Sequence, residues 1–167
     1  MKRRAINPAA LSIPTGYSHV ATVTGGTAVY VSGQIAFNKD AQIVGIGDLG
    51  AQAKQVYENL SGCLKAAGAT FQDVVKLVSY VVNLTPDKAA TVRAVRREYL
   101  GDAPYPASTM VGVTGLVNPD LLIEVEVIAF VADRPARSAA SSGKSAAKKN
   151  MPSKKASGKK APAKRKR

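Results

Sequence analysis

Hydrophobic and polar positions along the chain follow two different periods, and these periods predict strands and helices. Residues 20–23 and 28–32 are short β-prone runs joined through Gly25-Gly26, a pair that favours a hairpin turn. Residues 74–82 form a long β-branched run, which is typical of a buried strand. We therefore expect a hairpin near the N-terminus and a central strand further along the chain.

The last predicted strand, residues 121–131, has two different faces. Its odd-numbered positions are uniformly apolar, whereas Glu124 and Glu126 share the opposite face, about 7 Å apart. That face also carries Leu122, Ile128 and Phe130. The two carboxylates either belong to a solvated strand face, or one of them is held against apolar neighbours. Such neighbours raise the pKa of a carboxyl group and suit it to acid–base chemistry.

Two amphipathic helices are predicted between the strands. Residues 49–67 place apolar side chains at three- and four-residue spacing, with Asp48 suited to cap the start and Gly68 to end the helix. The second helix begins at Thr85-Pro86, with threonine as the N-cap and proline at the first helical position, and ends at Gly101.

A further strand over residues 107–114 completes the order ββαβαββ. This order predicts an α+β domain with two helices on one face of a mixed sheet. About 130 residues are enough for one domain with a sizeable core, and too few for two. No stretch approaches the roughly 18–20 apolar residues of a membrane span.

Charge divides the chain into two parts. Residues 134–167 hold 13 of the 24 basic residues and none of the 11 acidic ones, so they account for the whole net charge of +13. They contain no aromatic or branched aliphatic residue, and we predict a disordered tail after a neutral domain over residues 1–133. Such a tail suits electrostatic, sequence-independent contact with DNA or RNA. The alternative is a solubilising extension.

The residues that often carry chemistry are few. His19 is the single histidine, so no Ser-His or Cys-His pair has support, and Cys63, the single cysteine, falls on the apolar stripe of the first helix. No P-loop, dinucleotide fingerprint or metal-ligand spacing occurs, and we expect no metal and no cofactor. Polar residues and prolines interrupt residues 5–17, so no export signal is indicated and we expect a cytoplasmic protein.

Several short motifs follow one another between residues 13 and 131. They are Ser32-Gly33-Gln34-Ile35, Ala51-Gln52-Ala53 with Gln55 and Asn59, Ala66-Ala67-Gly68, Asp73-Val74-Val75-Lys76, Val82-Asn83-Leu84, and Ile123-Glu124-Val125-Glu126-Val127-Ile128-Ala129. Together with Tyr17, their order and spacing resemble the Rid family (reactive intermediate deaminases, also called the YjgF family). The resemblance covers the neutral domain and does not extend to the basic tail.

The resemblance implies a chorismate-mutase-like domain that forms a homotrimer, with small-molecule clefts at the subunit interfaces. Trimer formation would also cover the apolar second face of the sheet. In deaminating members an arginine pairs with the carboxylate of an enamine or imine, and a glutamate positions the water that hydrolyses the C=N bond. The matching glutamate is Glu124. The resemblance also places Tyr17, Ser32, Gly33 and Thr109 at the cleft.

Ser108 stands where the family pattern has the arginine, directly after a Pro-Ala pair. A serine hydroxyl donates one neutral hydrogen bond and cannot replace the two charged hydrogen bonds of a guanidinium group. The affinity for a carboxylate should therefore fall. Arg93, on the second helix where deaminating members often carry asparagine, is a candidate replacement. Alternatively, Arg93 is a solvated helix charge beside Arg96 and Arg97.

These features leave more than one function open. The first is an enzyme that hydrolyses an enamine or imine, and the second is a non-catalytic, metabolite-binding trimer tethered to DNA or RNA by its basic tails. Some relatives have been described as ribonucleases, but the domain lacks an evident phosphate-contacting cluster or catalytic histidine, so no cleavage role is assigned. Through its tails, the protein would associate with the nucleoid or chromatin.

Overall fold

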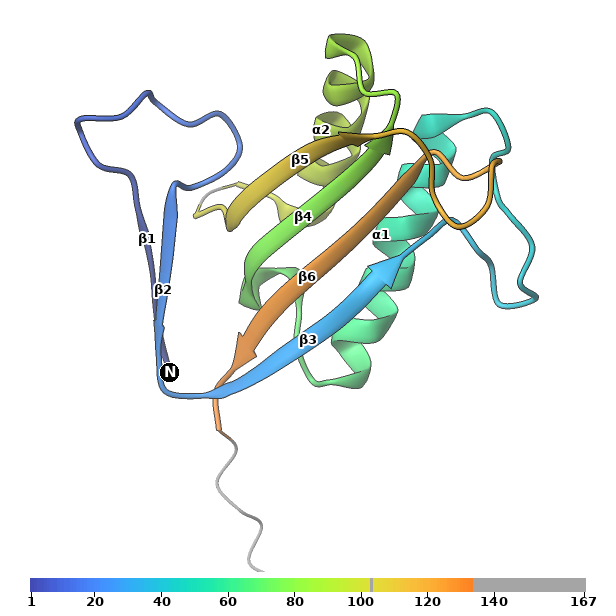
Figure 1. Ribbon diagram of the computed structural model, residues 1–167. Coiled ribbons are helices and arrows are strands. Elements are labelled where there is room, and N and C mark those ends of the chain that lie inside the picture. The colour runs from blue at the N-terminus through green and yellow to red at the C-terminus, as the bar shows by residue number, and fades with distance from the viewer. Residues whose placement is uncertain (103, 134–167) are drawn as a thin grey trace, which may run out of the picture. The chain divides into compact units, whose positions relative to one another are not determined.

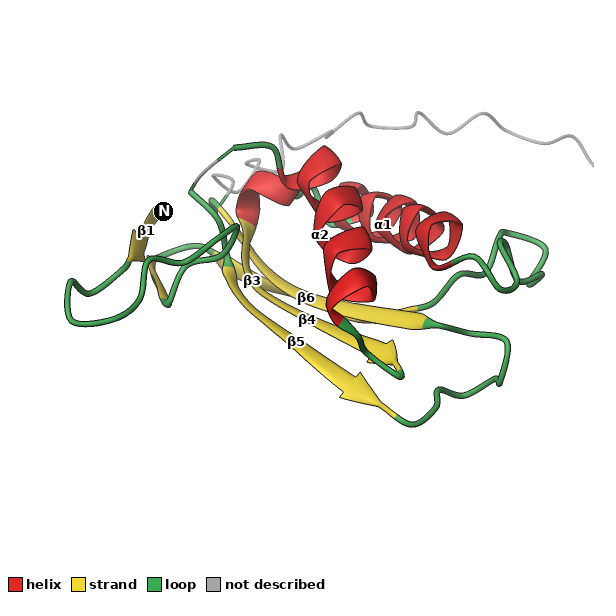
Figure 2. Cartoon of the chain, turned by 90° about the horizontal axis from the view of Figure 1, so that it is seen from above, coloured by secondary structure: helices red, strands yellow, loops and turns green. Residues whose placement is uncertain are grey.

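The computed structural model describes residues 1–102 and 104–133, which contain a four-stranded mixed sheet with two helices on one face (Figures 1 and 2). In spatial order the strands are β3 (Thr27–Gln34), β6 (Ile123–Val131), β4 (Val74–Val82) and β5 (Ala107–Val113). β6 runs antiparallel to both β3 and β4, whereas β4 and β5 are parallel. The predicted α+β class, with both helices on one side of a mixed sheet, is confirmed.

Both helices are capped by the residues that the sequence indicates. α1 (Leu49–Ala66) begins after Asp48, whose carboxylate accepts a hydrogen bond from the Ala51 amide. α2 (Pro86–Leu100) begins after Thr85, with proline in its first turn, and ends at Gly101, which has φ of +64°. A short 3₁₀ helix, η1 (Phe71–Asp73), leads into β4.

The core lies between the helices and the sheet. Fully buried side chains of α1 face those of β4 and β6; they include Val56, Tyr57, Leu60 and Leu64 from the helix and Leu77, Val81, Ile123 and Val125 from the strands. Along β6 the odd-numbered residues from Ile123 to Ala129 are buried, whereas the even-numbered ones and Val131 are half-buried. The two faces predicted for this strand are therefore present, and the face with Glu124 and Glu126 is the one away from the helices.

The predicted hairpin between residues 20–23 and 28–32 is wrong. β2 (Val20–Thr24) instead pairs with β1 (Lys2–Ile6), an unpredicted strand, and together they form a separate two-stranded sheet (Figure 1). Gly25 and Gly26 do form a sharp turn with φ of +72° and +93°, but this turn sends β3 to β6. Pairing with β6 lets β3 bury its apolar residues under α1, which a two-stranded hairpin could not provide.

Polar residues of α1 hold the loops at the ends of the strands. The fully buried Gln52 amide donates to the carbonyl oxygens of Gly45 and Asp120 at 3.2 and 2.7 Å, and it accepts from the Leu122 amide at 2.8 Å. Asn59 donates in the same way to two carbonyl oxygens of the loop that follows β3. The motif residues Gln52 and Asn59 therefore have structural roles in this fold.

The predicted tail, residues 134–167, lies outside the described residues. Its predicted disorder therefore stays a prediction. In the part of the chain that the structure describes, neither helix has the length and apolar character needed to cross a membrane.

Candidate functional site

A pocket of about 440 Å³ lies where α2, β5 and the loop before β2 meet. We call it the α2 pocket; its lining residues are Thr15, Tyr17, Arg93, Arg96, Ser108 and Met110. Tyr17 reaches the pocket because Ser18 bonds to the segment that enters β5: its amide donates to Pro106 O and its hydroxyl to Tyr105 O. The structure thus brings together three of the predicted site residues, Tyr17, Arg93 and Ser108.

Arg96 is the charged residue of this pocket that the sequence motifs did not indicate. Its side chain is only 6% exposed; Nη1 donates to Ser108 Oγ at 3.0 Å and Nη2 donates to Gly16 O at 2.8 Å. Arg96, named in the sequence only as a neighbour of Arg93, is therefore a buried residue of the pocket and not a solvated helix charge. Arg96 follows the buried Val92 by four residues, so helical spacing places it on the buried side of α2. That spacing is the signal that could have identified it.

The α2 pocket is positively charged. Burial lowers the pKa of Arg96, and the nearby charges of Arg93 and Arg97 lower it further, although Tyr57 and Tyr105 act in the opposite direction. An arginine stays protonated in spite of such shifts. Among the described residues the single salt bridge joins Lys39 to Asp40, and neither residue lines this pocket. No carboxylate of the described residues therefore forms an ion pair with Arg96.

The predicted catalytic carboxylate lies in a second group of residues, on the face of the sheet away from the helices. The pairing of β3 with β6 is irregular between Val31 and Gln34, so Ser32 and Gly33 form a β-bulge opposite this part of β6. Glu124 lies directly against the bulge, because a Cβ atom placed on Gly33 would overlap its Oε1. We call Ser32, Gly33 and Glu124 the bulge cluster. Bulges of this kind often orient a side chain at a functional site.

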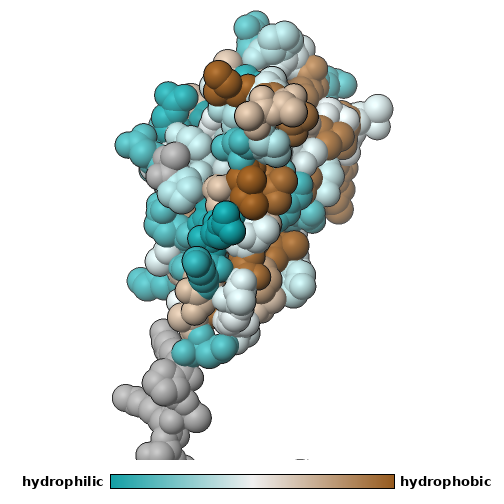
Figure 3. All heavy atoms as spheres, turned by 90° about the vertical axis from the view of Figure 1, so that its left-hand side faces the viewer, coloured by the Kyte–Doolittle hydropathy of each residue, from teal (hydrophilic) through white to brown (hydrophobic). Residues whose placement is uncertain are grey.

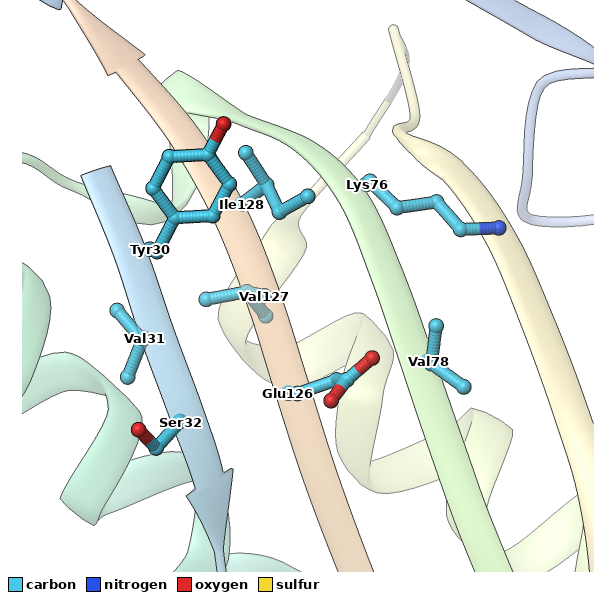
Figure 4. Close-up of a pocket in the computed structure, with 8 residues that line it drawn as sticks. All are labelled: Tyr30, Val31, Ser32, Lys76, Val78, Glu126, Val127 and Ile128. Carbon is cyan, nitrogen blue, oxygen red and sulfur yellow. The ribbon is translucent and has the colours of Figure 1, made fainter. Parts of the chain in front are cut away.

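A pocket of about 370 Å³ extends over the same face of the sheet, and Figure 4 shows the side chains that line it. Glu126 points from β6 toward β4 and accepts a hydrogen bond from the Tyr80 hydroxyl at 3.4 Å. Lys76 points toward β5, where its ammonium donates to Thr109 Oγ1 at 2.7 Å. The predicted site residue Thr109 is thus engaged by Lys76 on this face.

The predicted site residues are divided between the two faces of the sheet. Neighbouring strand residues point to opposite sides, so Ser108 faces α2 while Thr109 faces away from it. Tyr17 and Arg93 lie with Ser108, whereas the bulge cluster lies on the other face. Within one chain, Glu124 therefore does not meet Ser108 in a single cleft. The described residues also contain no group of three His, Cys, Asp or Glu that could hold a metal ion.

The loop that carries Tyr17 is supported by His19. The two rings make an edge-to-face contact with centroids 5.3 Å apart, and His19 Nε2 lies 2.9 Å from Ser12 O, so this nitrogen must be the donor. A structural role for the lone histidine agrees with the geometry. Figure 3 shows apolar patches on this side of the molecule, and the same loop exposes Leu11 and Ile13.

Comparison with protein families assigns the domain. Residues 8–131 match the family model described as Endoribonuclease L-PSP. YjgH of Escherichia coli K12, a RutC family protein, is 30% identical over 135 residues, which cover 80% of this chain and 99% of YjgH. The chain belongs to the Rid (YjgF) family. This confirms the resemblance that the motifs indicate, and Rid proteins are generally oligomeric and bind small molecules.

Solved structures of Rid proteins have the same fold. The Rid family protein YyfB of Yersinia pestis, whose function is described as unknown, is 41% identical with a TM-score of 0.73; the match covers 78% of this chain and all of YyfB. RidA of the Antarctic bacterium Psychrobacter sp. PAMC 21119 is 30% identical with a TM-score of 0.57, over 72% of this chain and 92% of RidA.

Proposed function

We propose that this Rid protein hydrolyses a small imine or enamine, with Glu124 as the residue that activates water. The observation that carries this proposal is the position of Glu124: its carboxylate lies against Gly33 at a β-bulge, beside the exposed Ser32. The contact with Gly33 restricts where the carboxylate can lie. A general base must be positioned in this way to accept a proton from an attacking water.

The reaction needs only water as co-reactant. Glu124 accepts a proton while the water oxygen forms a bond to the imine carbon, and the C=N π electrons move to nitrogen, which takes up a proton. The carbinolamine then breaks its C–N bond; nitrogen leaves with a further proton as ammonia, and the carbon becomes a carbonyl. An enamine enters the same sequence after it has tautomerised to the imine.

We further propose that the complete cleft forms between protomers of a homotrimer. The α2 pocket and the bulge cluster lie on opposite faces of one sheet, so two protomers could each supply one half of a site. A cyclic arrangement, in which unlike surfaces of identical chains meet, joins such halves three times. It would also cover Tyr30, which is 76% exposed beside Ile128 on the sheet face away from the helices.

Ammonia release from imines and enamines tests the hydrolysis. Glu124→Gln keeps the shape of the side chain and removes the base, so turnover should fall by roughly 10²–10⁴-fold. Glu126→Gln is the matched control, because Glu126 lies on the same strand face but bonds to Tyr80. Unchanged turnover in Glu124→Gln would exclude the proposed role. Ligand binding without any ammonia release would instead favour a non-catalytic binding protein.

A second candidate function belongs to the basic tail. The concentration of 13 positive charges and no negative ones in residues 134–167 supports electrostatic attachment of the protein to DNA or RNA. Three tails on one trimer would act together and raise the overall affinity, although each binds weakly. Such attachment would hold the protein at the nucleoid or chromatin.

A further inference from the structure

We propose that Arg96 and Arg93 of α2 bind the anionic end of the ligand, a carboxylate or a phosphate, in place of the arginine that position 108 lacks. The inference rests on the proposed function for where the reaction takes place, and it adds the class of substrate. Its starting point is Arg96 in the α2 pocket, which is only 6% exposed and forms no ion pair among the described residues.

The bonds of Arg96 leave it able to hold a ligand. A guanidinium group has five N–H donors, and the bonds to Ser108 Oγ and Gly16 O use two of them. Both acceptors are neutral, so they orient the guanidinium group of Arg96 without cancelling its charge. Ser108 accepts from Arg96 through its oxygen, and its own hydroxyl hydrogen remains free to donate. A serine at this position therefore fits beside an anion that Arg96 holds.

Charge favours an anion over a neutral group in this pocket. Arg93 lines it three residues before Arg96, and among the residues that the structure describes the lining includes no carboxylate. The like charges of Arg93 and Arg97 lower the pKa of Arg96, and an anion would offset this repulsion. The burial of Arg96 strengthens each ionic contact relative to water. A planar carboxylate also matches the guanidinium fork.

The geometry explains how Ser108 and Arg96 belong together. Arg96 Nη1 lies 3.0 Å from Ser108 Oγ, so its guanidinium group is directly beside position 108. Beside position 108, this chain therefore supplies a guanidinium group from the helix rather than from β5. A ligand that has an anionic group and a C=N carbon would then bind with its anionic group against the arginines of α2.

Binding of an unreactive probe tests this inference separately from turnover. Calorimetry on the full chain would compare 2-oxobutanoate with its neutral amide, 2-oxobutanamide, and with inorganic phosphate. We expect the amide to bind roughly 10–100-fold more weakly than 2-oxobutanoate, because it lacks the charge that Arg96 meets. Tighter binding of phosphate than of 2-oxobutanoate would support the anion site and assign phosphate as the group it prefers.

Variants identify the residues responsible. Arg96→Met should weaken 2-oxobutanoate binding roughly 10–100-fold, and Arg93→Met roughly 3–10-fold. Arg4→Met is the matched control, because it removes one exposed arginine from β1, outside the lining of the α2 pocket, and should leave binding unchanged. The double variant Arg96→Met with Ser108→Arg places the guanidinium group on β5 instead of α2. It should recover most of the lost affinity for 2-oxobutanoate.

Several results would overturn the inference. They are equal binding of the acid and the amide by the natural protein, full affinity in Arg96→Met, and an equal loss in Arg4→Met. If Arg96→Met does not fold, Arg96→Lys and Arg93→Met decide: unchanged affinity in both contradicts the site, and a loss in either supports it. Since 2-oxobutanoate needs no hydrolysis to bind, a failure of ammonia release in the natural protein leaves this test intact.

Discussion

Gly33 shows how one residue links the fold to the proposed chemistry. Its backbone does not need a left-handed conformation; the requirement for glycine comes from space, because Glu124 Oε1 occupies the position where a Cβ atom would lie. The bulge in β3 and the carboxylate on β6 therefore fit together only when position 33 carries no side chain.

Replacing Gly33 with alanine should displace Glu124 without unfolding the domain. We expect ammonia release to fall roughly 10–100-fold, because a shift of about 1 Å at a reacting group has effects of this size. The assay is the one used for Glu124→Gln, and circular dichroism would check the fold. Full turnover in Gly33→Ala would mean that the position of Glu124 against the bulge does not matter.

At the scale of elements, α1 does more than cover the sheet. Gln52 and Asn59 connect this helix to loops at the ends of β3 and β6 by hydrogen bonds to backbone groups. The helix thus holds the segments on either side of the bulge cluster, and its stability bears on the position of Glu124.

Gln52→Leu should destabilise the protein strongly. The variant keeps the approximate size of the side chain but leaves two carbonyl oxygens and one amide without their partner, at a cost of about 2–5 kcal/mol. Urea unfolding would measure the free energy of unfolding. Gln55→Leu is the control, because Gln55 bonds only to the Asn59 side chain in the described structure, and its loss should stay below about 1.5 kcal/mol.

Gly62→Ala should have the opposite effect on α1. Gly62 lies inside the helix, and a Cβ atom there would meet nothing within 4 Å. Alanine loses less backbone entropy on folding, so the free energy of unfolding should rise by about 0.5–1 kcal/mol. A decrease in the same urea experiment would contradict this prediction.

At the scale of the whole molecule, the proposed sharing of each cleft between two protomers would make activity depend on assembly. If each cleft combines the α2 pocket of one protomer with the bulge cluster of another, two impaired variants can complement each other. Glu124→Gln protomers keep an intact α2 pocket, and Arg96→Met protomers keep an intact Glu124.

Mixed trimers of these two variants should therefore regain activity. In every trimer that contains both variants, one of the three clefts combines two intact halves, so ammonia release should approach about one third of the natural level. The measurement uses protein co-expressed from two tagged chains and purified through both tags. Activity no higher than that of either variant alone would show that the cleft is not shared between protomers.

The basic tail should control binding to nucleic acid. If residues 134–167 make Z phosphate contacts, the logarithm of the binding constant for duplex DNA should fall with the logarithm of salt concentration with a slope of about −0.9Z. Truncation after Asp133 should abolish this binding and leave ammonia release unchanged. Tight, salt-insensitive DNA binding by the truncated protein would contradict a role for the tail.

Features that depend on neighbouring residues could be read from the sequence. The helices, their caps at Asp48 and Thr85, the two faces of residues 121–131 and the division of charge follow from local period and composition. The motifs also identified the family, and they indicated Glu124 as a candidate site residue. The family follows from the order of motifs along the domain, and the other properties from nearby residues, so no knowledge of distant contacts is required.

Partner choice between distant segments was decided only by the tertiary structure. β3 pairs with β6 rather than β2, because this pairing buries apolar residues from segments about a hundred positions apart. The contact of Arg96 with Ser108 likewise depends on how α2 packs beside β5, and so does the separation of Ser108 from Glu124. The burial of a charged residue is settled by the free energy of the assembled core, which local patterns do not contain.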